Sequence, residues 1–216
     1  YDVFVPENAN GAGIVYMESG GWLSIWVDPE RRQATFEPLL TEGFTVFAVH
    51  HGSAPRFKVP EAVSDVRAAV RHIKKHALEH GVDANRLGVW GGSAGGHLSL
   101  MLGLDPEDKP QVASGQGRMG ANYAVSADDD ARVAAIVAFY PPVDIRNRVG
   151  PSERFPALDF PKDQADAISP ILFVSKDDPP TKLIHGDADE LVPLADSLIL
   201  SEALEKAGVT HELLVV

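Results

Sequence analysis

The sequence contains no cysteine, which excludes disulfides, thiolate metal ligands and cysteine nucleophiles. It is also poor in basic residues: 19 lysines and arginines stand against 31 acidic residues, a formal net charge of −12. Nucleic-acid surfaces and polybasic membrane anchors both need clustered positive charge, so neither kind of partner is expected. No apolar run reaches the roughly 18 residues that a membrane-spanning helix needs.

What remains is the composition of a folded protein. The 216 residues are 44% hydrophobic and 23% charged, enough to build a full core. At about 150 residues per domain, the length predicts one domain over residues 1–216. The first residue is Tyr1 rather than methionine, which is compatible with a removed leader or a trimmed chain.

Short apolar runs typical of buried strands alternate with helical patterns along the chain. Strands are expected at 2–5, 14–17, 44–49, 87–90, 133–140, 182–185 and 212–216, and helices at 60–81, 94–104 and 193–207. This alternation predicts an α/β fold with a mostly parallel sheet and helices on both faces. Residues 105–131 and 145–180 interrupt it and are too long for ordinary loops, so we expect insertions that line or cover a site.

The strongest chemical signal is the sequence GGSAGG at residues 91–96, between an expected strand and an expected helix. In that context Gly-x-Ser-x-Gly predicts a nucleophile elbow, in which the serine occupies a strained turn between small neighbours. Ser93 is therefore the candidate nucleophile. The alternatives are a plain helix cap by Ser93, which needs no glycine on both sides, and a phosphate-binding loop, whose lysine is absent.

A serine nucleophile needs backbone N–H donors for the oxyanion that forms on the substrate carbonyl. The residue after the nucleophile, Ala94, would supply one donor. A glycine-rich loop after an early strand would supply the others, and Glu18-Ser19-Gly20-Gly21-Trp22 follows the expected strand 14–17. Trp22 and Trp26 could form a wall for an acyl or aryl group, or could simply pack in a surface loop.

Four segments together resemble one family: residues 15–22, 55–73, the elbow GGSAGGHLSL and LIHGDADELVP at 183–193. They are similar to the α/β-hydrolase esterases of the hormone-sensitive-lipase-like and bacterial feruloyl-esterase-like group. The resemblance implies an α/β-hydrolase fold, a carboxylesterase activity with a Ser–Asp–His triad, and no cofactor or metal. We expect the sheet to lack edge elements at both ends.

One departure from the family pattern concerns the oxyanion loop, which usually reads His-Gly-Gly-Gly-Trp. Here Glu18 stands in place of the histidine and Ser19 in place of the first glycine. Serine tolerates positive φ poorly, which would distort the loop if that position required it. A Glu18 carboxylate pointing inward would oppose the oxyanion, whereas one pointing away would only brace the loop. The expected donors are the N–H groups of Ser19, Gly20 and Ala94.

The resemblance assigns the triad acid to Asp189, in the motif His-Gly-x-x-Asp-x-x-Val-Pro. Such an acid orients the histidine and stabilises its charged form. Asp187 is the rival, with turn formation as its alternative role. Asp144 follows another strand and is expected to brace a loop.

None of the eight histidines fits the base well. His97 and His185 are expected to be structural, His50 and His51 could line the pocket, and His211 precedes the last strand. His72, His76 and His80 recur on one helix, where a solvated face is favoured over a metal site. Because the family carries its catalytic histidine just after the last strand, we expect the base beyond Val216. The alternative is that this polypeptide lacks a base.

The predicted function is hydrolysis of a small or carbohydrate-linked carboxylic ester through an acyl-enzyme on Ser93, with a small-molecule ester as the partner. Two alternatives remain: a catalytically impaired binding protein with a hydrolase fold, and a serine peptidase of the same fold.

Overall fold

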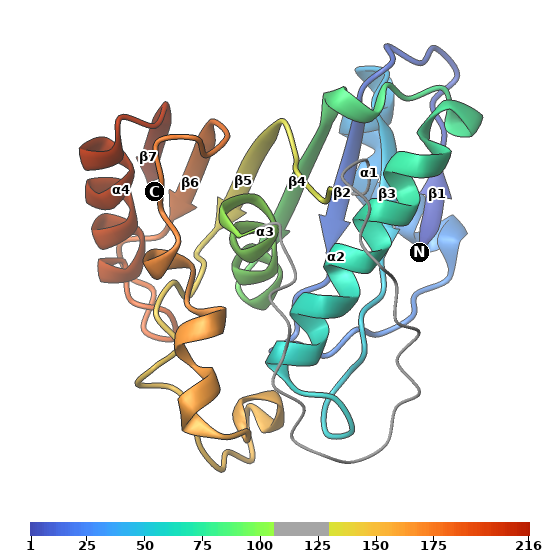
Figure 1. Ribbon diagram of the computed structural model, residues 1–216. Coiled ribbons are helices and arrows are strands. Elements are labelled where there is room, and N and C mark those ends of the chain that lie inside the picture. The colour runs from blue at the N-terminus through green and yellow to red at the C-terminus, as the bar shows by residue number, and fades with distance from the viewer. Residues whose placement is uncertain (106–129) are drawn as a thin grey trace.

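A computed structural model describes residues 1–105 and 130–216 and shows one seven-stranded sheet (Figure 1). The strand order is β1-β3-β2-β4-β5-β6-β7. The strands are β1 (Asp2–Phe4), β2 (Gly13–Met17), β3 (Thr45–Val49), β4 (Leu87–Gly92), β5 (Ala135–Phe139), β6 (Thr181–His185) and β7 (His211–Val215). Each strand expected from the apolar pattern is present, within a few residues of its expected bounds.

All neighbouring strands from β3 to β7 pair in parallel, and only β1 runs antiparallel, against β3. Met17 at the end of β2 lies opposite both Val49 and Gly91. The carboxyl ends of the parallel strands therefore meet at one edge, where α/β proteins build their sites. The expected α/β class with a mostly parallel sheet is confirmed. In the described residues β1 and β7 form the two edges, and the absence of further edge elements stays a prediction.

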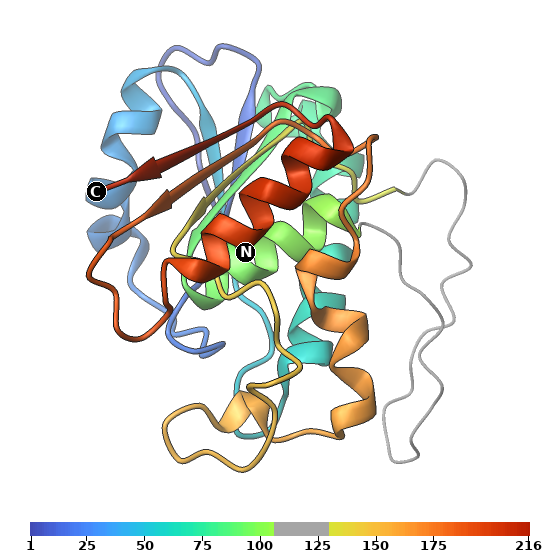
Figure 2. The same cartoon turned by 90° about the vertical axis from the view of Figure 1, so that its left-hand side faces the viewer.

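Helices cover both faces of this sheet (Figure 2). Helices α2 (Val59–His76), α3 (Ala94–Leu104) and α4 (Ala195–Ala207) pack on one face, and α1 (Pro29–Thr41) packs on the other. Every residue of α3 is buried, because the helix lies between the sheet and α2. This explains why its sequence is apolar on all sides instead of amphipathic.

Helix α1 was not expected from the sequence. It contains Pro38 and many charged residues, and only Arg32 and Phe36 are buried along it. Its start does carry a recognisable signal, because Asp28 accepts a hydrogen bond from the Glu30 N–H (3.0 Å) and proline follows it. The helix expected over 60–81 ends earlier, at His76, and continues as a 3-10 turn up to Gly81, whose φ of 70° ends it.

The larger core fills the space between the sheet and helices α2 to α4, and a smaller one lies under α1. The large, fully buried side chains of the larger core include Phe47, Leu98, Met101, Ile136 and Leu183. The smaller core consists of Phe4, Phe36, Val46 and Ala48.

Residues 145–180 form short 3-10 helices that lie beyond the carboxyl ends of the strands (Figure 1). These helices are Pro156–Leu158, Lys162–Gln164, Asp166–Ile168 and Pro170–Leu172. The other expected insertion, 105–131, falls almost entirely outside the described residues. Among the helices of the described residues, none has the length and apolarity to cross a bilayer.

Candidate active site

Ser93 occupies a strained turn between β4 and α3. Its φ and ψ are 51° and −118°, and among the described non-glycine residues only Trp22 and Tyr140 also have positive φ. The turn is held on both sides: the Ser93 N–H donates to the Phe139 carbonyl (2.9 Å), and its own carbonyl accepts from the His97 N–H (2.9 Å). Such strain on a non-glycine residue costs free energy and is typical of functional turns.

The glycines beside Ser93 are required by close backbone contacts. A Cβ at Gly91 would lie 2.5 Å from the carbonyl of Gly95, and a Cβ at Gly95 would lie 2.3 Å from the carbonyl oxygen of Met17. Both distances are far below any allowed contact, so only glycine fits. The elbow expected at residues 91–95 is present, and it touches the end of β2, where the oxyanion loop begins.

The oxyanion loop avoids the strain anticipated at Ser19. Positive φ occurs at Gly20, Gly21 and Trp22 (65°, 66° and 62°), and Ser19 does not have it. Ser19 therefore does not need a positive φ, and the non-glycine residue of this loop that adopts one is Trp22. Within the described residues, no acceptor is found for the backbone N–H groups of Ser19, Gly20, Gly21 and Ala94.

Glu18 is turned toward α1. Its carboxylate forms a buried ion pair with Arg32, whose guanidinium lies over the ring of Tyr16, 5.8 Å from the ring centre. Both side chains are about nine-tenths buried. Glu18 does not line the cavity beside Ser93. Of the two alternatives for this residue, the bracing role fits the structure, because the charge of the carboxylate is compensated by Arg32.

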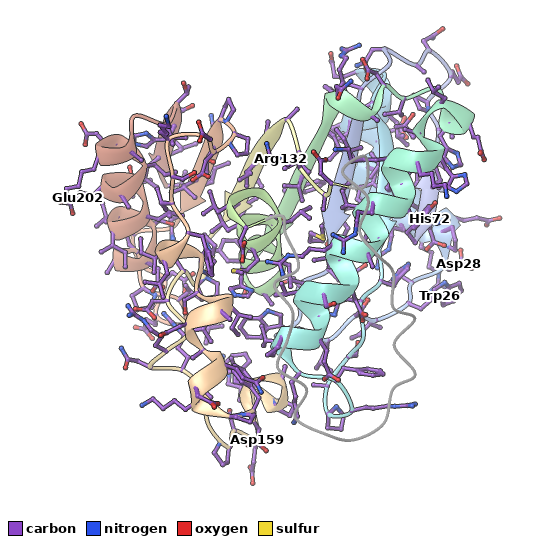
Figure 3. The ribbon with its side chains drawn as sticks, in the orientation of Figure 1. Trp26, Asp28, His72, Arg132, Asp159 and Glu202 are labelled. Carbon is purple, nitrogen blue, oxygen red and sulfur yellow. The ribbon has the colours of Figure 1, made fainter. Side chains whose placement is uncertain are left out.

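A cavity of about 160 Å³ opens beside Ser93. It is lined by Gly21, Trp22, Ser93, Pro142, Arg148, Ser152, Phe155, Leu158, Leu191 and Val192. The ring of Phe155 packs on Gly21, where a Cβ would lie 2.8 Å from it. The segment 145–180 thus closes one side of the cavity, as expected. Trp22 is buried in its wall, whereas Trp26 is 64% exposed and lies near Asp28 at the outer side of the molecule (Figure 3).

Asp189 lies in the loop after β6. Its Oδ1 accepts from the N–H groups of Leu191 (2.8 Å) and Val192 (3.0 Å), two residues that line the cavity. Its Oδ2 lies 3.8 Å from His185 Nε2, too far for a hydrogen bond, and has no other partner in the described residues. Asp187, its rival, is exposed.

Asp144 braces its own loop, as expected. Its carboxylate accepts from the backbone and side chain of Arg146, with the shortest contact at 2.7 Å. The hydrogen bonds from Arg146 lower the pKa of Asp144. The carboxylate is thus committed to this pairing.

His97 is a structural residue, as expected. Its Nε2 donates to the Ile168 carbonyl (2.8 Å), so its Nδ1 is free to accept from Trp22 Nε1 (3.2 Å). Burial lowers the pKa of His97 to about 4, and the nearby charge of Arg148 acts in the same direction. A neutral imidazole with both nitrogens engaged cannot serve Ser93 as a base.

His185 is likewise engaged on both sides, donating to the Val192 carbonyl and accepting from Ser197 Oγ, both at 2.7 Å. His50 and His51 do not line the cavity, contrary to one expectation: His50 pairs with Asp2 (2.9 Å), and His51 bonds the Gly52 carbonyl (2.9 Å). No histidine in the described residues, which include all eight, is hydrogen-bonded to Ser93.

The remaining candidates for a metal do not assemble. Over residues 1–105 and 130–216, no three histidine or acidic side chains come together as a metal would require. His72 and His76 lie on α2 with their ring centres 4.5 Å apart, whereas His80 lies in the 3-10 turn that follows and its ring contacts Phe47.

Sequence reasoning did not identify the side chains that shape the cavity opposite the elbow. Arg148, Ser152, Phe155 and Leu158 come from the irregular segment 145–180. The length of that segment indicated a role near the site. Nothing local in the sequence distinguishes these residues from their neighbours, because their positions depend on the packing of the whole segment.

The comparisons with known proteins agree with this geometry. A family model described as BD-FAE matches residues 1–204. "Probable carboxylic ester hydrolase LipM" of Mycobacterium tuberculosis is 30% identical over 199 residues, 85% of this chain and 42% of that protein. "Esterase LipQ" of the same organism is 27% identical over 210 residues, 90% of this chain and 46% of that protein. The chain thus spans less than half the length of these curated relatives.

Solved structures give the same result. The "truncated form of carbohydrate esterase from gut microbiota" has a TM-score of 0.75 and 30% identity, and the match covers 99% of this chain and 80% of that one. Esterase 2 of Thermogutta terrifontis, phosphorylated by paraoxon, has a TM-score of 0.77 and 26% identity, with 99% and 75% covered.

Proposed function

The chain belongs to the BD-FAE family, and from this premise we propose that it hydrolyses carboxylic esters with Ser93 as the nucleophile. The names of its relatives, which are esterases and a carboxylic ester hydrolase, support the reaction class. The carbohydrate esterase among its structural neighbours supports a small or carbohydrate-linked ester as substrate.

The observation that carries this proposal is the placement of Ser93. A serine with φ of 51° is held between two glycines, at the cavity and beside a loop with free N–H groups. A helix cap needs neither the strain nor the cavity. A strained serine aimed at a cavity is what acyl transfer requires.

In the proposed reaction, Ser93 Oγ attacks the ester carbonyl carbon and loses its proton to a base. The N–H groups of Ser19, Gly20 and Ala94 hold the resulting oxyanion, which then collapses as the alcohol leaves with a proton. Water cleaves the acyl-enzyme by the same route. The ion pair of Glu18 with Arg32 supports this reading, since it keeps an uncompensated carboxylate away from the oxyanion.

We assign the triad acid to Asp189, whose Oδ2 is available to a histidine N–H. The base itself would follow Val216. The Val216 N–H donates to the His185 carbonyl (3.0 Å), and its carbonyl accepts from the Asp187 N–H (3.0 Å). A chain continuing from this point would start beside the loop that carries Asp189.

The test is hydrolysis of 4-nitrophenyl acetate by the full-length protein. Ser93→Ala should abolish turnover, and Ser201→Ala, on α4 and outside the cavity lining, should leave it unchanged. Unchanged turnover in Ser93→Ala would overturn the nucleophile assignment. If the full-length protein neither turns over the ester nor reacts with a fluorophosphonate probe, the binding-protein alternative replaces the esterase.

A further inference from the structure

Arg148 stands apart among the residues that line the cavity, because it is the charged one. Seven of the others are glycine or apolar residues, and the polar ones are Ser93 and Ser152. An apolar cavity with one cation on its wall is unexpected in a chain with a net charge of −12 unless the cation serves the fold or a ligand. The contacts of Arg148 separate these two roles.

One side of the guanidinium is fixed by the fold. Arg148 Nη2 donates to Asp196 Oδ2 (2.6 Å), and Asp196 Oδ1 accepts from the Val143 N–H (3.0 Å). Asp196 lies in the first turn of α4 and is only 8% exposed. The carboxylate lies at the helix N-terminus and accepts both hydrogen bonds, so it holds the arginine in one orientation.

The other side of the guanidinium is open. An arginine side chain has five N–H donors, and within the described residues the only hydrogen bond of the Arg148 guanidinium is the one to Asp196. The side chain is 29% exposed, and none of its nitrogens is both buried and without a hydrogen-bond partner. Ser152 Oγ accepts from the Phe155 N–H (3.0 Å) and keeps its own proton to donate. The cavity thus presents donors away from Ser93.

We propose that Arg148, assisted by Ser152, binds a carboxylate carried by the substrate, so that the preferred ester has an apolar skeleton ending in an acid. This inference rests on the proposed esterase function of the same cavity. A planar guanidinium with free donors matches the two oxygens of a carboxylate, and the low polarity around it strengthens the contact. Among the described residues, no carboxylate lines the cavity to repel such a group.

The test compares two esters of one shape with the full-length protein: the 4-nitrophenyl monoester of adipic acid and the 4-nitrophenyl ester of adipamic acid, whose terminal amide is neutral. The wild type should favour the acid over the amide in kcat/KM. Arg148→Gln should reduce this preference by about 10- to 100-fold, the range for a hydrogen-bonded charged group. An unchanged preference overturns the proposal.

A second variant separates ligand binding from a purely structural ion pair. Asp196→Asn keeps the acceptor for Val143 but removes the charge that offsets Arg148. It should therefore raise the preference for the acidic ester. If Arg148 and Asp196 only stabilise the fold, both variants should lose activity equally toward the two esters, and the preference for the acid should not change. If thermal unfolding shows that Arg148→Gln does not fold, Asp196→Asn decides alone, and no rise in preference overturns the proposal.

A binding measurement distinguishes failure of the carboxylate site from failure of the proposed esterase function. Monoethyl adipate is titrated calorimetrically into Ser93→Ala, with and without Arg148→Gln. Binding that Arg148→Gln weakens supports the carboxylate site even if no ester is hydrolysed. If hydrolysis depends on Ser93 but shows no preference for the acidic ester, the esterase function stands and the carboxylate site at Arg148 is overturned.

Discussion

At the scale of single residues, the elbow is the part of the site that sequence alone could predict. Its sequence signal is local, because glycines two residues before and after Ser93 are needed where the elbow turn closes on itself and meets the end of β2. The oxyanion loop was predicted less well. Its positive φ values begin at Gly20 and extend to Trp22, and no pattern reveals that shift of one residue from Ser19.

Two glycines of β4 give a matched test of this local packing. Gly91→Ala forces a Cβ into the backbone of Gly95, whereas a Cβ at Gly88 meets only an ordinary contact, 3.7 Å from the Ala135 carbonyl. We expect Gly91→Ala to lower the free energy of unfolding by about 3 kcal/mol. Gly88→Ala should change it by less than about 1 kcal/mol. Urea denaturation measures both, and equal effects would contradict the packing argument.

His97 predicts a pH dependence of stability. Burial lowers its folded-state pKa to about 4, while in the unfolded chain its pKa keeps the ordinary histidine value of 6.5. Between these values the unfolded state binds the proton and the native state does not. Stability therefore falls as pH drops from 6.5 to 4, by an order of 3 kcal/mol from this residue.

The measurement is urea unfolding of the wild type and His97→Gln across this pH range. The variant loses the hydrogen bonds of His97 and is less stable at pH 7, but its stability should decline less steeply on acidification. Identical slopes in the two proteins would show that His97 is not the buried neutral group described here.

At the scale of elements, the oxyanion loop is anchored to α1, a helix that the apolar pattern of the sequence does not predict. Helix α1 buries Arg32 to reach Glu18 across 14 positions of sequence. The pair could not be predicted, because nothing in the sequence around Glu18 indicates its partner. In this protein the ion pair of Glu18 with Arg32 joins the oxyanion loop to α1.

Neighbouring arginines of α1 test this anchor. Arg32→Leu leaves a buried carboxylate without a partner and should cost about 3–5 kcal/mol of unfolding free energy. Arg31→Leu, on the exposed side of the same helix, should stay within about 0.5 kcal/mol. Thermal unfolding distinguishes the two. If Arg32→Leu is as mild as its neighbour, the ion pair does not hold the loop.

The loop after β6 offers a second matched pair. Asp189→Asn keeps an acceptor for Leu191 and Val192 but loses the charge proposed to orient the base, so kcat in the full-length protein should fall about 10³- to 10⁴-fold. Asp187→Asn, on the exposed turn, should leave kcat nearly unchanged. A larger loss for Asp187→Asn would reverse the assignment of the acid.

At the scale of the whole molecule, the parallel sheet brings the parts of the site together. The loops after β2, β4 and β6 carry the oxyanion loop, Ser93 and Asp189, and the segment 145–180 closes the cavity from outside. The order of the strands and of helices α2 to α4 was predictable because apolar periodicity indicates burial directly, whereas α1, with few buried residues, was not predicted. The cavity wall was not, since Arg148 and Phe155 reach it only through the irregular packing of that segment.

This arrangement also predicts where the proposed catalytic base should lie. We propose that residues 1–216 form one domain. Its last described residue, Val216, lies beside the loop that carries Asp189. In the full-length protein, a histidine shortly after Val216 should therefore be essential, and its replacement by alanine should reduce kcat as severely as Ser93→Ala. Full activity without any such histidine would contradict the proposed triad.

The central claim, that Ser93 is an activated nucleophile, is tested most directly by reaction with paraoxon, which phosphorylates a structural neighbour. The full-length protein is treated with paraoxon, and its peptides are analysed by mass spectrometry. We expect one diethylphosphoryl group, on Ser93 of the wild type, and no such group on the Ser93→Ala variant. A modified protein in which Ser93 stays free, with the label on another residue, would contradict it.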